Sequence, residues 1–132
     1  MSHWYVWNRD TDEITAFKHD ILTEPQEWWV NEYKDQLGKS RHAGSTVIRD
    51  IWISTVFLAI DYNFLGGRPV LFETMIFDIL GKKRRYDYYQ ERYHTPAEAR
   101  IGHDKIVSIA RRLLCRAPQI SYDSFEKILR KL

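Results

Sequence analysis

The sequence predicts an α+β fold, an antiparallel β-sheet packed by two or three helices. Two observations lead to this prediction: β-prone segments separated by turns fill most of residues 1–93, and the strongest helix signals follow residue 94. The resulting element order, β-β-α-β-β-β-α-α, is typical of folds that keep their helices on one side of a sheet. At 132 residues, 44% of them hydrophobic, the chain is expected to form a single domain over 1–132.

The amino-terminal third predicts a β-hairpin over 1–20 and a helix over 23–37. Two short aromatic or β-branched segments flank a polar turn, which is the pattern of a hairpin. Thr23 stands three residues before Gln26, with Pro25 between them, and this spacing predicts a capped helix start.

The middle of the chain predicts a three-strand antiparallel meander over 47–93. Small polar residues at 39–46 predict a loop. The segment 47–62 is apolar on both faces, which predicts a central strand covered on two sides, or one long enough to change partners partway. A turn with Gly and Pro leads to a second strand at 70–79, and the alternating segment 86–93 predicts a third.

The carboxyl-terminal third predicts two helices. The sequence Thr-Pro-Ala-Glu at 95–98 combines a cap, a first-turn proline and a glutamate that reaches back to the cap, so a helix is expected over 96–115. His103 falls on the apolar stripe of that helix. Ser121 can cap a terminal helix over 121–132.

Charge and motif content exclude several function classes. Twenty basic and 18 acidic residues give a net charge of +2, so neither an acidic nucleic-acid mimic nor sequence-specific DNA binding is expected. The charge is uneven: 6 basic against 10 acidic residues in 1–66 give −4, and 14 against 8 in 67–132 give +6.

No motif indicates a cofactor or a dedicated zinc site, and we expect neither. The chain has one cysteine, Cys115, which excludes an intramolecular disulfide. The histidines lack metal-binding spacing, and no nucleophile elbow, Walker or dinucleotide loop occurs. The sequence shows no secretion signal and no apolar stretch long enough to span a membrane, so a cytoplasmic protein is expected.

Asp61, Glu73 and His103 form the candidate polar site. Glu73 lies in an apolar strand, where an unpaired carboxylate costs several kcal/mol. If the three side chains converge, they suit acid/base chemistry or a divalent metal. The alternatives are structural: Glu73 faces solvent or pairs with Arg92 or His103, and His103 is a hydrogen-bonded core residue.

A basic turn is the candidate binding feature for phosphate. Its clustered charge attracts phosphates, and the tyrosines after it offer stacking surfaces. In the alternative, the turn is solvated and keeps a sheet edge soluble. Likewise, the tryptophans are either core residues or a protein interface. The phosphate-binding candidates are Lys82, Lys83, Arg84, Arg85 and Tyr88, with Arg111, Arg112 and Arg116 as an extension, and the tryptophans are Trp4, Trp7, Trp28 and Trp29.

Several segments resemble a group of small proteins encoded by tailed phages and prophages. The resembling blocks are Ser54–Tyr62 (STVFLAIDY), Gly66–Pro69, Leu71–Phe77 (LFETMIF), Arg92–Thr95 and Glu98–His103. The resemblance extends over residues 50–107 and leaves out the terminal helix. It implies a phage origin and a shared fold, and it implies no particular reaction.

The combined expectation is a phage-encoded binding module without enzymatic activity. It would act in the host cytoplasm on a host protein or a nucleotide-type ligand, with an effect on host functions or defence. The alternative is a small acid/base or metal-dependent enzyme that uses Asp61, Glu73 and His103. The residues leave the oligomeric state open.

Overall fold

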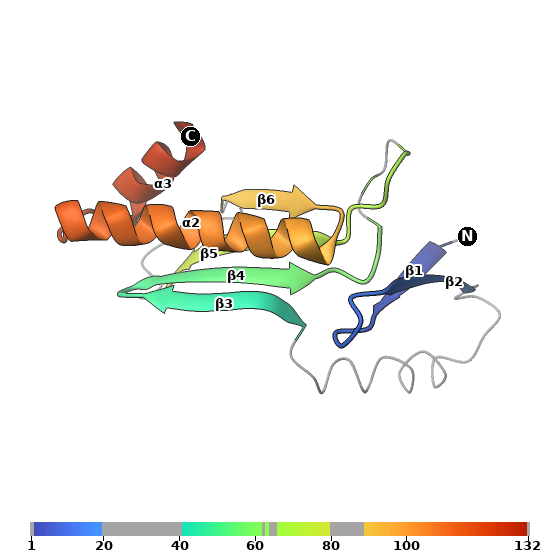
Figure 1. The fold of residues 1–132 in the computed structure, drawn as a ribbon. Helices are drawn as coiled ribbons and strands as arrows, with labels where there is room; N and C mark the ends of the chain where they lie inside the picture. Colours follow the sequence, from blue (N-terminus) through green and yellow to red (C-terminus); the bar gives the residue numbers. More distant parts are fainter. Residues whose placement is uncertain (1, 20–40, 62, 64–65, 80–88, 132) are drawn as a thin grey trace.

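The computed structural model describes residues 2–19, 41–61, 63, 66–79 and 89–131 (Figure 1). The described elements form two antiparallel sheets and two helices, which confirms the predicted α+β class. The strands are β1 (Ser2–Trp7), β2 (Ile14–His19), β3 (His42–Ile48), β4 (Ile51–Phe57), β5 (Phe72–Asp78) and β6 (Gln90–Tyr93), and the helices are α2 (Pro96–Arg116) and α3 (Tyr122–Lys131).

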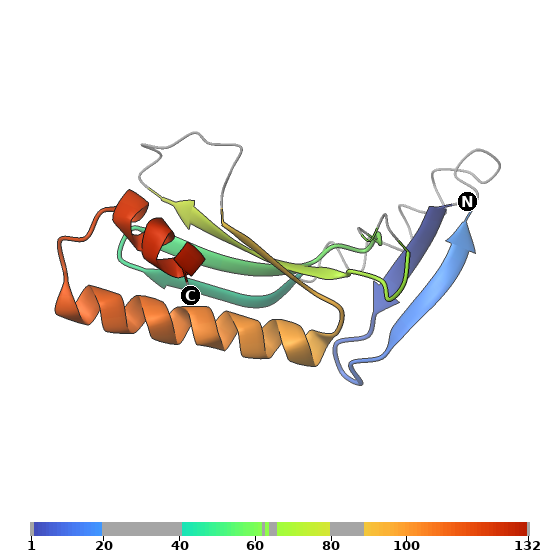
Figure 2. The same ribbon diagram turned by 90° about the horizontal axis from the view of Figure 1, so that it is seen from above.

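The larger sheet has the strand order β3-β4-β5-β6, and each neighbouring pair is antiparallel. Figure 2 shows α2 and α3 against the same face of this sheet. The smaller sheet is the predicted hairpin, in which β1 pairs with β2. A backbone hydrogen bond joins this hairpin to the segment that directly follows β4: the Tyr5 amide donates to the Ala59 carbonyl at 2.9 Å.

Both helices begin where their capping residues predict. The Thr95 hydroxyl accepts a hydrogen bond from the Glu98 amide at 3.1 Å and donates one to the Glu98 carboxylate at 3.2 Å. Pro96 lies in the first turn of α2. At α3 the Ser121 hydroxyl accepts a bond from the Ser124 amide at 3.2 Å. No helix in the described part of the chain combines the length and the apolarity needed to cross a bilayer.

The predicted loop over 39–46 and the predicted single strand over 47–62 are wrong. Residues 42–46 belong to β3, and a tight turn after Ile48 separates β3 from β4. Arg49 in this turn has a φ of 56°, in the left-handed region. No turn was predicted there, because such a position is usually occupied by glycine or asparagine and not by arginine. Among the described strands, the meander therefore has one more strand than predicted.

The other predicted elements agree with the structure wherever it describes them. Strand β5 lies within the predicted strand at 70–79, and β6 forms the end of the one at 86–93. Helices α2 and α3 match the predictions within one residue at each end. The predicted helix over 23–37 and residues 86–88 lie outside the described residues.

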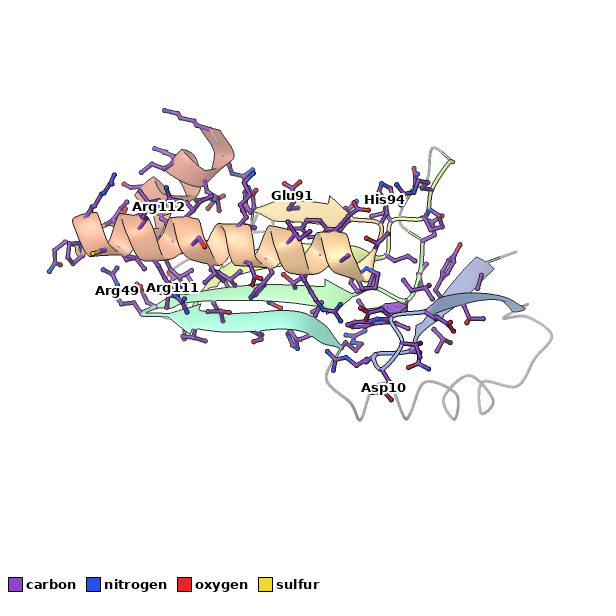
Figure 3. All side chains as sticks on the ribbon, viewed as in Figure 1. Asp10, Arg49, Glu91, His94, Arg111 and Arg112 are labelled. Carbon is purple, nitrogen blue, oxygen red and sulfur yellow. The ribbon has the colours of Figure 1, made fainter. Side chains whose placement is uncertain are left out.

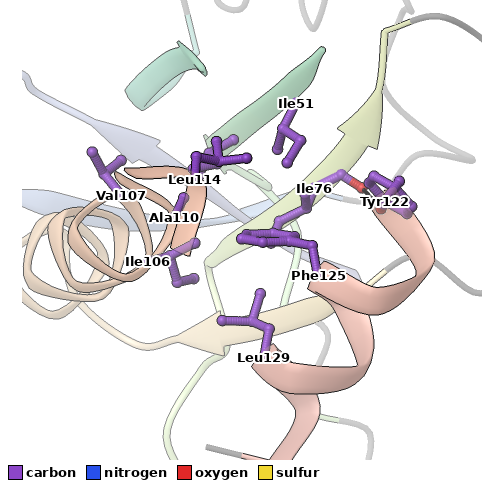
Figure 4. Packing of buried hydrophobic residues seen from close by; sticks show 10 residues of the cluster. Ile51, Ile76, Ile106, Val107, Ala110, Leu114, Tyr122, Phe125 and Leu129 are labelled. Carbon is purple, nitrogen blue, oxygen red and sulfur yellow. Dashed lines mark hydrogen bonds between the residues drawn. The ribbon is translucent and has the colours of Figure 1, made fainter. Parts of the chain in front are cut away.

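A first apolar cluster joins both helices to the sheet. Figure 4 shows it around Phe125, which is fully buried. The Tyr122 hydroxyl donates a hydrogen bond to the Ile76 carbonyl at 2.6 Å, so a polar contact also ties α3 to β5. The remaining buried members are Ile51, Ile53, Ile106, Val107, Ala110, Leu114 and Leu129.

A second apolar cluster joins the small hairpin to the sheet. Trp7 is 4% exposed and packs edge-on against Phe57 and Phe72, with ring centroids 5.9 and 5.2 Å away. Trp7 is therefore a core residue and not part of an exposed interface. The side chains of the other three tryptophans named above, Trp4, Trp28 and Trp29, lie outside the described residues.

Two glycines allow close contact between α2 and the sheet. A Cβ atom added to Gly44 in β3 would lie 2.6 Å from the ring of His103. A Cβ atom added to Gly102 in α2 would lie 2.3 Å from the ring and hydroxyl of Tyr93. Positive φ angles among the described glycines occur only at 66 and 67, so Gly44 and Gly102 provide space and not an unusual backbone conformation.

A Gly102→Ala variant tests this packing, because helix propensity and packing predict opposite effects. Alanine in place of a mid-helix glycine ordinarily stabilises a helix by ~1 kcal/mol. Here we expect the free energy of unfolding to fall by ~1–3 kcal/mol, since the new methyl group meets Tyr93. Urea unfolding measures the change, with Ser108→Ala at an exposed position of α2 as the control. A stabilised Gly102→Ala protein would contradict the close packing.

Candidate functional site

A chain of four hydrogen bonds crosses the interface between α2 and the sheet. The His103 ring bonds Thr46 Oγ1 through Nε2 at 2.9 Å and Thr55 Oγ1 through Nδ1 at 2.7 Å. Thr55 Oγ1 lies 2.5 Å from Thr74 Oγ1, and Thr74 donates to the Tyr93 hydroxyl at 3.1 Å. These five residues, named the polar chain below, connect all four strands of the larger sheet to α2.

The bonds of the polar chain run in one direction. Thr74 donates its only hydroxyl proton to Tyr93, so it accepts from Thr55. Thr55 has then used its own proton and accepts from the ring, which places the ring proton of His103 on Nδ1. Nε2 accepts from the Thr46 hydroxyl. One ring donor and one ring acceptor correspond to a neutral imidazole.

Strand and helix periodicity place the polar chain inside the core. Thr55 shares the inward face of β4 with Ile53 and Phe57, because every second residue of a strand points to the same side. Thr55 and Thr74 are paired across β4 and β5, and both are 0% exposed. They separate the first apolar cluster from the second. Buried hydroxyls are costly unless hydrogen-bonded, and here each has a partner.

Burial keeps His103 neutral. The side chain is 4% exposed, and loss of solvent lowers the pKa of His103 below its ordinary value of 6.5. The charge of Asp104 raises this pKa in part, and His42 lowers it further. The lowered pKa agrees with the neutral ring that the hydrogen bonds require.

The polar chain ends at a pocket between β6, α2 and α3. The pocket has a volume of about 250 Å³, and its lining includes Tyr89, Glu91, Tyr93 and Lys105. The Tyr89 hydroxyl donates to the Glu91 carboxylate at 3.2 Å. Burial, followed by the charge of Glu91, raises the pKa of Tyr89 to about 12, and burial also raises the pKa of Tyr93. Both hydroxyls are therefore protonated donors at neutral pH.

Asp61 holds the connection between β4 and β5. Its Oδ1 accepts hydrogen bonds from the Asn63 amide at 2.8 Å and from the Val70 amide at 2.9 Å. One carboxylate oxygen thus joins the two ends of this connection. Asp61 also adds to the pKa increase of Tyr5, which burial causes in the first place. Asp61 therefore has a structural role in the connection between β4 and β5.

Glu73 lies on the sheet face opposite His103. Glu73 precedes Thr74 in β5, and successive side chains of a strand point to opposite faces. Its carboxylate accepts a hydrogen bond from Arg92 Nε at 2.9 Å, which is one of the structural alternatives. The structure therefore does not bring Asp61, Glu73 and His103 into one site. Within the described ranges, no three His, Cys, Asp or Glu side chains gather where they could hold a metal ion.

The face opposite α2 also carries a small aromatic and polar group. His42 Nε2 lies 3.1 Å from Ser54 Oγ, and Trp52 Nε1 donates to Ser45 Oγ at 3.0 Å. The Trp52 ring contacts the rings of His42 and Phe77, with centroids 5.9 and 5.2 Å apart. Burial, followed by two nearby arginines, lowers the pKa of His42.

Arginines gather at one end of the molecule, beside the connection between α2 and α3. Figure 3 labels Arg49, Arg111 and Arg112 at this end, and Arg49 donates to the Ile120 carbonyl at 3.2 Å. Arg116 occupies the last turn of α2. We name Arg49, Arg111, Arg112 and Arg116 the arginine end. The predicted phosphate-binding residues Lys82, Lys83, Arg84, Arg85 and Tyr88 lie outside the described residues.

Sequence reasoning identified His103 and missed its partners. Thr46 falls in the predicted loop over 39–46, and Thr55 falls in the predicted strand over 47–62, where the sequence assigns it no role. A usable signal was present, because Thr55, Thr74 and His103 each interrupt an apolar face. Tyr89, Glu91 and Lys105 belong to no sequence motif. They come together only in the fold, where β6 meets both helices.

Comparisons with protein-family models, with curated proteins and with solved structures found no match to this chain. The resemblance to small phage proteins remains a prediction from the residues quoted for it. The polar chain, the pocket and the arginine end are therefore the features from which a function can be argued.

A Thr55→Val variant tests the polar chain. Valine keeps the shape of threonine but removes the donor to Thr74 and leaves the Nδ1 proton of His103 without an acceptor. We expect the free energy of unfolding to fall by ~2–4 kcal/mol, since each unsatisfied buried group costs ~1–3 kcal/mol. Thr55→Ser keeps the hydroxyl and serves as the control. Equal stability of the Val and Ser variants in urea unfolding would show that the hydroxyl is not needed.

The neutral state of His103 predicts a pH dependence of stability. In the unfolded chain His103 takes up a proton near its ordinary pKa of 6.5, whereas the folded protein resists protonation. Stability is therefore retained above pH 6.5 and lost as the pH falls below that value, until the lower folded pKa is reached. The loss is at most ~1.4 kcal/mol per pH unit.

Urea unfolding between about pH 7.5 and about pH 5.5 measures this loss. His42 has a lowered pKa of the same sign, so the comparison uses His42→Gln with and without His103→Asn. We expect the steeper loss of stability in the protein that retains His103. Equal slopes in the two proteins would mean that His103 titrates normally.

Proposed function

We propose that this chain is a phage-encoded accessory protein that binds a nucleotide-type ligand in the host cytoplasm. The phage origin is inferred from the resemblance to small phage proteins. The protein would then affect host functions or defence. The binding role is supported by the arginine end, the observation that carries this proposal. The alternative, a host protein as partner, is separated from it by the experiment below.

The carboxyl-terminal part of the chain has an excess of positive charge. Residues 111–131 contain six basic and two acidic residues, a net charge of +4. Arg49 forms an ion pair with the Asp50 carboxylate at 3.4 Å. In the part of the chain that the structure describes, no ion pair involves Arg111, Arg112 or Arg116.

Exposed guanidinium groups suit a phosphate better than a single carboxylate. Each guanidinium presents a planar set of donors that can bond two phosphate oxygens at once. Arg112 and Arg116 lie one turn apart on the same side of α2, so a ligand with two or more phosphates can contact both of them. A nucleoside diphosphate or triphosphate fits this arrangement.

The alternative of a small enzyme loses its basis. It required Asp61, Glu73 and His103 to converge, whereas Glu73 and His103 lie on opposite faces of the sheet and each has a structural partner. Acid/base chemistry at a shared centre needs groups within hydrogen-bond reach of the same substrate atoms. No observation on the described residues favours a second catalytic site.

Calorimetric titration with ATP, GTP, CTP and UTP tests the proposal. We expect at least one of them to bind, and the triple variant Arg111→Ser, Arg112→Ser, Arg116→Ser to bind it at least ~tenfold more weakly, because charge-assisted contacts are lost. Binding should also weaken between about 50 and about 200 mM salt. The matched variant with three lysines keeps the charge but loses the paired guanidinium bonds, so its affinity should lie between those of the original chain and the serine variant.

Two outcomes would contradict the proposed function. One is that none of the four nucleotides binds below ~1 mM, where the binding free energy is only about −4.1 kcal/mol. The other is that host lysate yields a stoichiometric host protein bound to the chain and no nucleotide. A parallel variant with serine at Lys82, Lys83, Arg84 and Arg85 tests whether the predicted basic turn adds to the arginine end.

A further inference from the structure

The pocket at the end of the polar chain has apolar walls and a polar edge. Ile106 and Ile109 of α2 and Leu129 of α3 line it together with the ring of Tyr89. Its volume of about 250 Å³ admits a compact ring system. The pocket is thus a slot between two helices and a strand, and its walls suit the faces of a planar molecule.

Tyr93 supplies a buried donor to this pocket. The residue is 8% exposed, and its hydroxyl accepts a hydrogen bond from Thr74 at 3.1 Å. No acceptor for its own O–H proton is found in the described part of the chain. The hydroxyl lies against Gly102, which also lines the pocket and has no side chain to cover it. A buried donor without an acceptor is costly, and a ligand in the pocket can remove this cost.

An anionic acceptor and a cationic donor lie at the same edge of the pocket as Tyr93. The Glu91 carboxylate accepts one bond from Tyr89 at 3.2 Å and has capacity for further bonds. Lys105 lines the pocket with a cationic donor, and no ion pair for it is found among the described residues. The pocket therefore offers a neutral donor, an anionic acceptor and a cation around apolar walls.

The geometry points to this pocket as the binding site for the nucleobase of a nucleotide-type ligand. A purine or pyrimidine has two apolar faces and an edge with both acceptors and donors, which matches the walls, Tyr93 and Glu91. A purely apolar ligand would leave the Tyr93 proton unpaired, and a simple anion would be repelled by Glu91. This inference rests on the proposed function, because it names the part of the ligand that the arginine end does not contact.

The position of the cations on α2 agrees with a nucleotide. Lys105, Arg112 and Arg116 lie seven and four residues apart, which places them on one side of the helix. Seven residues of helix span ~10 Å. These three cations therefore lead from the pocket to the arginine end. A nucleotide can place its base in the pocket and its phosphates at the arginine end.

Amide chemical-shift titration of the 132-residue chain tests the inference. The probes are adenosine, guanosine, cytidine and uridine, which lack phosphate. We expect at least one nucleoside to give saturable shifts at Gly102 and Lys105. No saturable shift at these residues up to ~10 mM of any nucleoside would overturn the inference.

A matched pair of tryptophan variants locates the site. Ile109→Trp places an indole in the pocket and should weaken nucleoside binding at least ~tenfold. Ile101→Trp adds the same side chain at a position of α2 that is 71% exposed and outside the pocket, and should leave binding within ~twofold. Equal affinities for the two variants would overturn the inference.

A second variant does not depend on filling the pocket. Tyr93→Phe keeps the ring and removes the donor, and we expect nucleoside binding to weaken ~three- to tenfold in the folded protein. Unchanged affinity in folded Tyr93→Phe would overturn the inference.

Inorganic pyrophosphate and the four nucleoside 5′-diphosphates separate this inference from the proposed function. If pyrophosphate shifts Arg112 and Arg116 while no nucleoside binds, the base site is wrong and the phosphate site stands. If a nucleoside binds in the pocket while phosphate adds no affinity, the base site stands and the proposed function is wrong.

Discussion

The hydrogen-bonded chain through His103 is the interaction on which the rest of the structure depends. Its members come from four strands and α2, and it separates two apolar clusters that would otherwise form one core. Apolar contacts are non-directional and tolerate sliding of a helix over a sheet, whereas hydrogen bonds to buried groups do not. A single unsatisfied group in this chain costs ~1–3 kcal/mol, a large share of the ~5–15 kcal/mol that stabilises a typical domain.

The alignment that the polar chain sets also determines what the surface presents. Gly44 lets the His103 ring approach β3, and Gly102 lets Tyr93 approach α2, so the helix lies close to the sheet at both points. The same contact places the Tyr93 hydroxyl beside Gly102 at the pocket. From the pocket, the cations of α2 follow the helix towards the α2–α3 connection. In this arrangement the structural core and the proposed binding surface share one residue, Tyr93, so changes to the core are expected to alter binding.

Local signals in the sequence predicted much of the fold, and contacts between distant segments explain the rest. The Thr95 cap and the hairpin of β1 and β2 follow from spacing alone. The strand at 42–48 could not be predicted, because its small polar residues are suitable only where Gly44 faces His103 from a helix 59 residues later in the chain. The turn at Arg49 had no local signal. The candidate trio failed because Glu73 and Thr74 are neighbours in sequence and lie on opposite faces of the sheet.

A two-bond nitrogen–proton correlation spectrum of the His103 ring tests the polar chain most directly. The hydrogen bonds predict a neutral ring with its proton on Nδ1, and burial lowers the pKa of this ring below its ordinary value of 6.5. A ring protonated on Nε2, or one that exchanges between tautomers and titrates near pH 6.5, would contradict the polar chain and the alignment of α2 that depends on it.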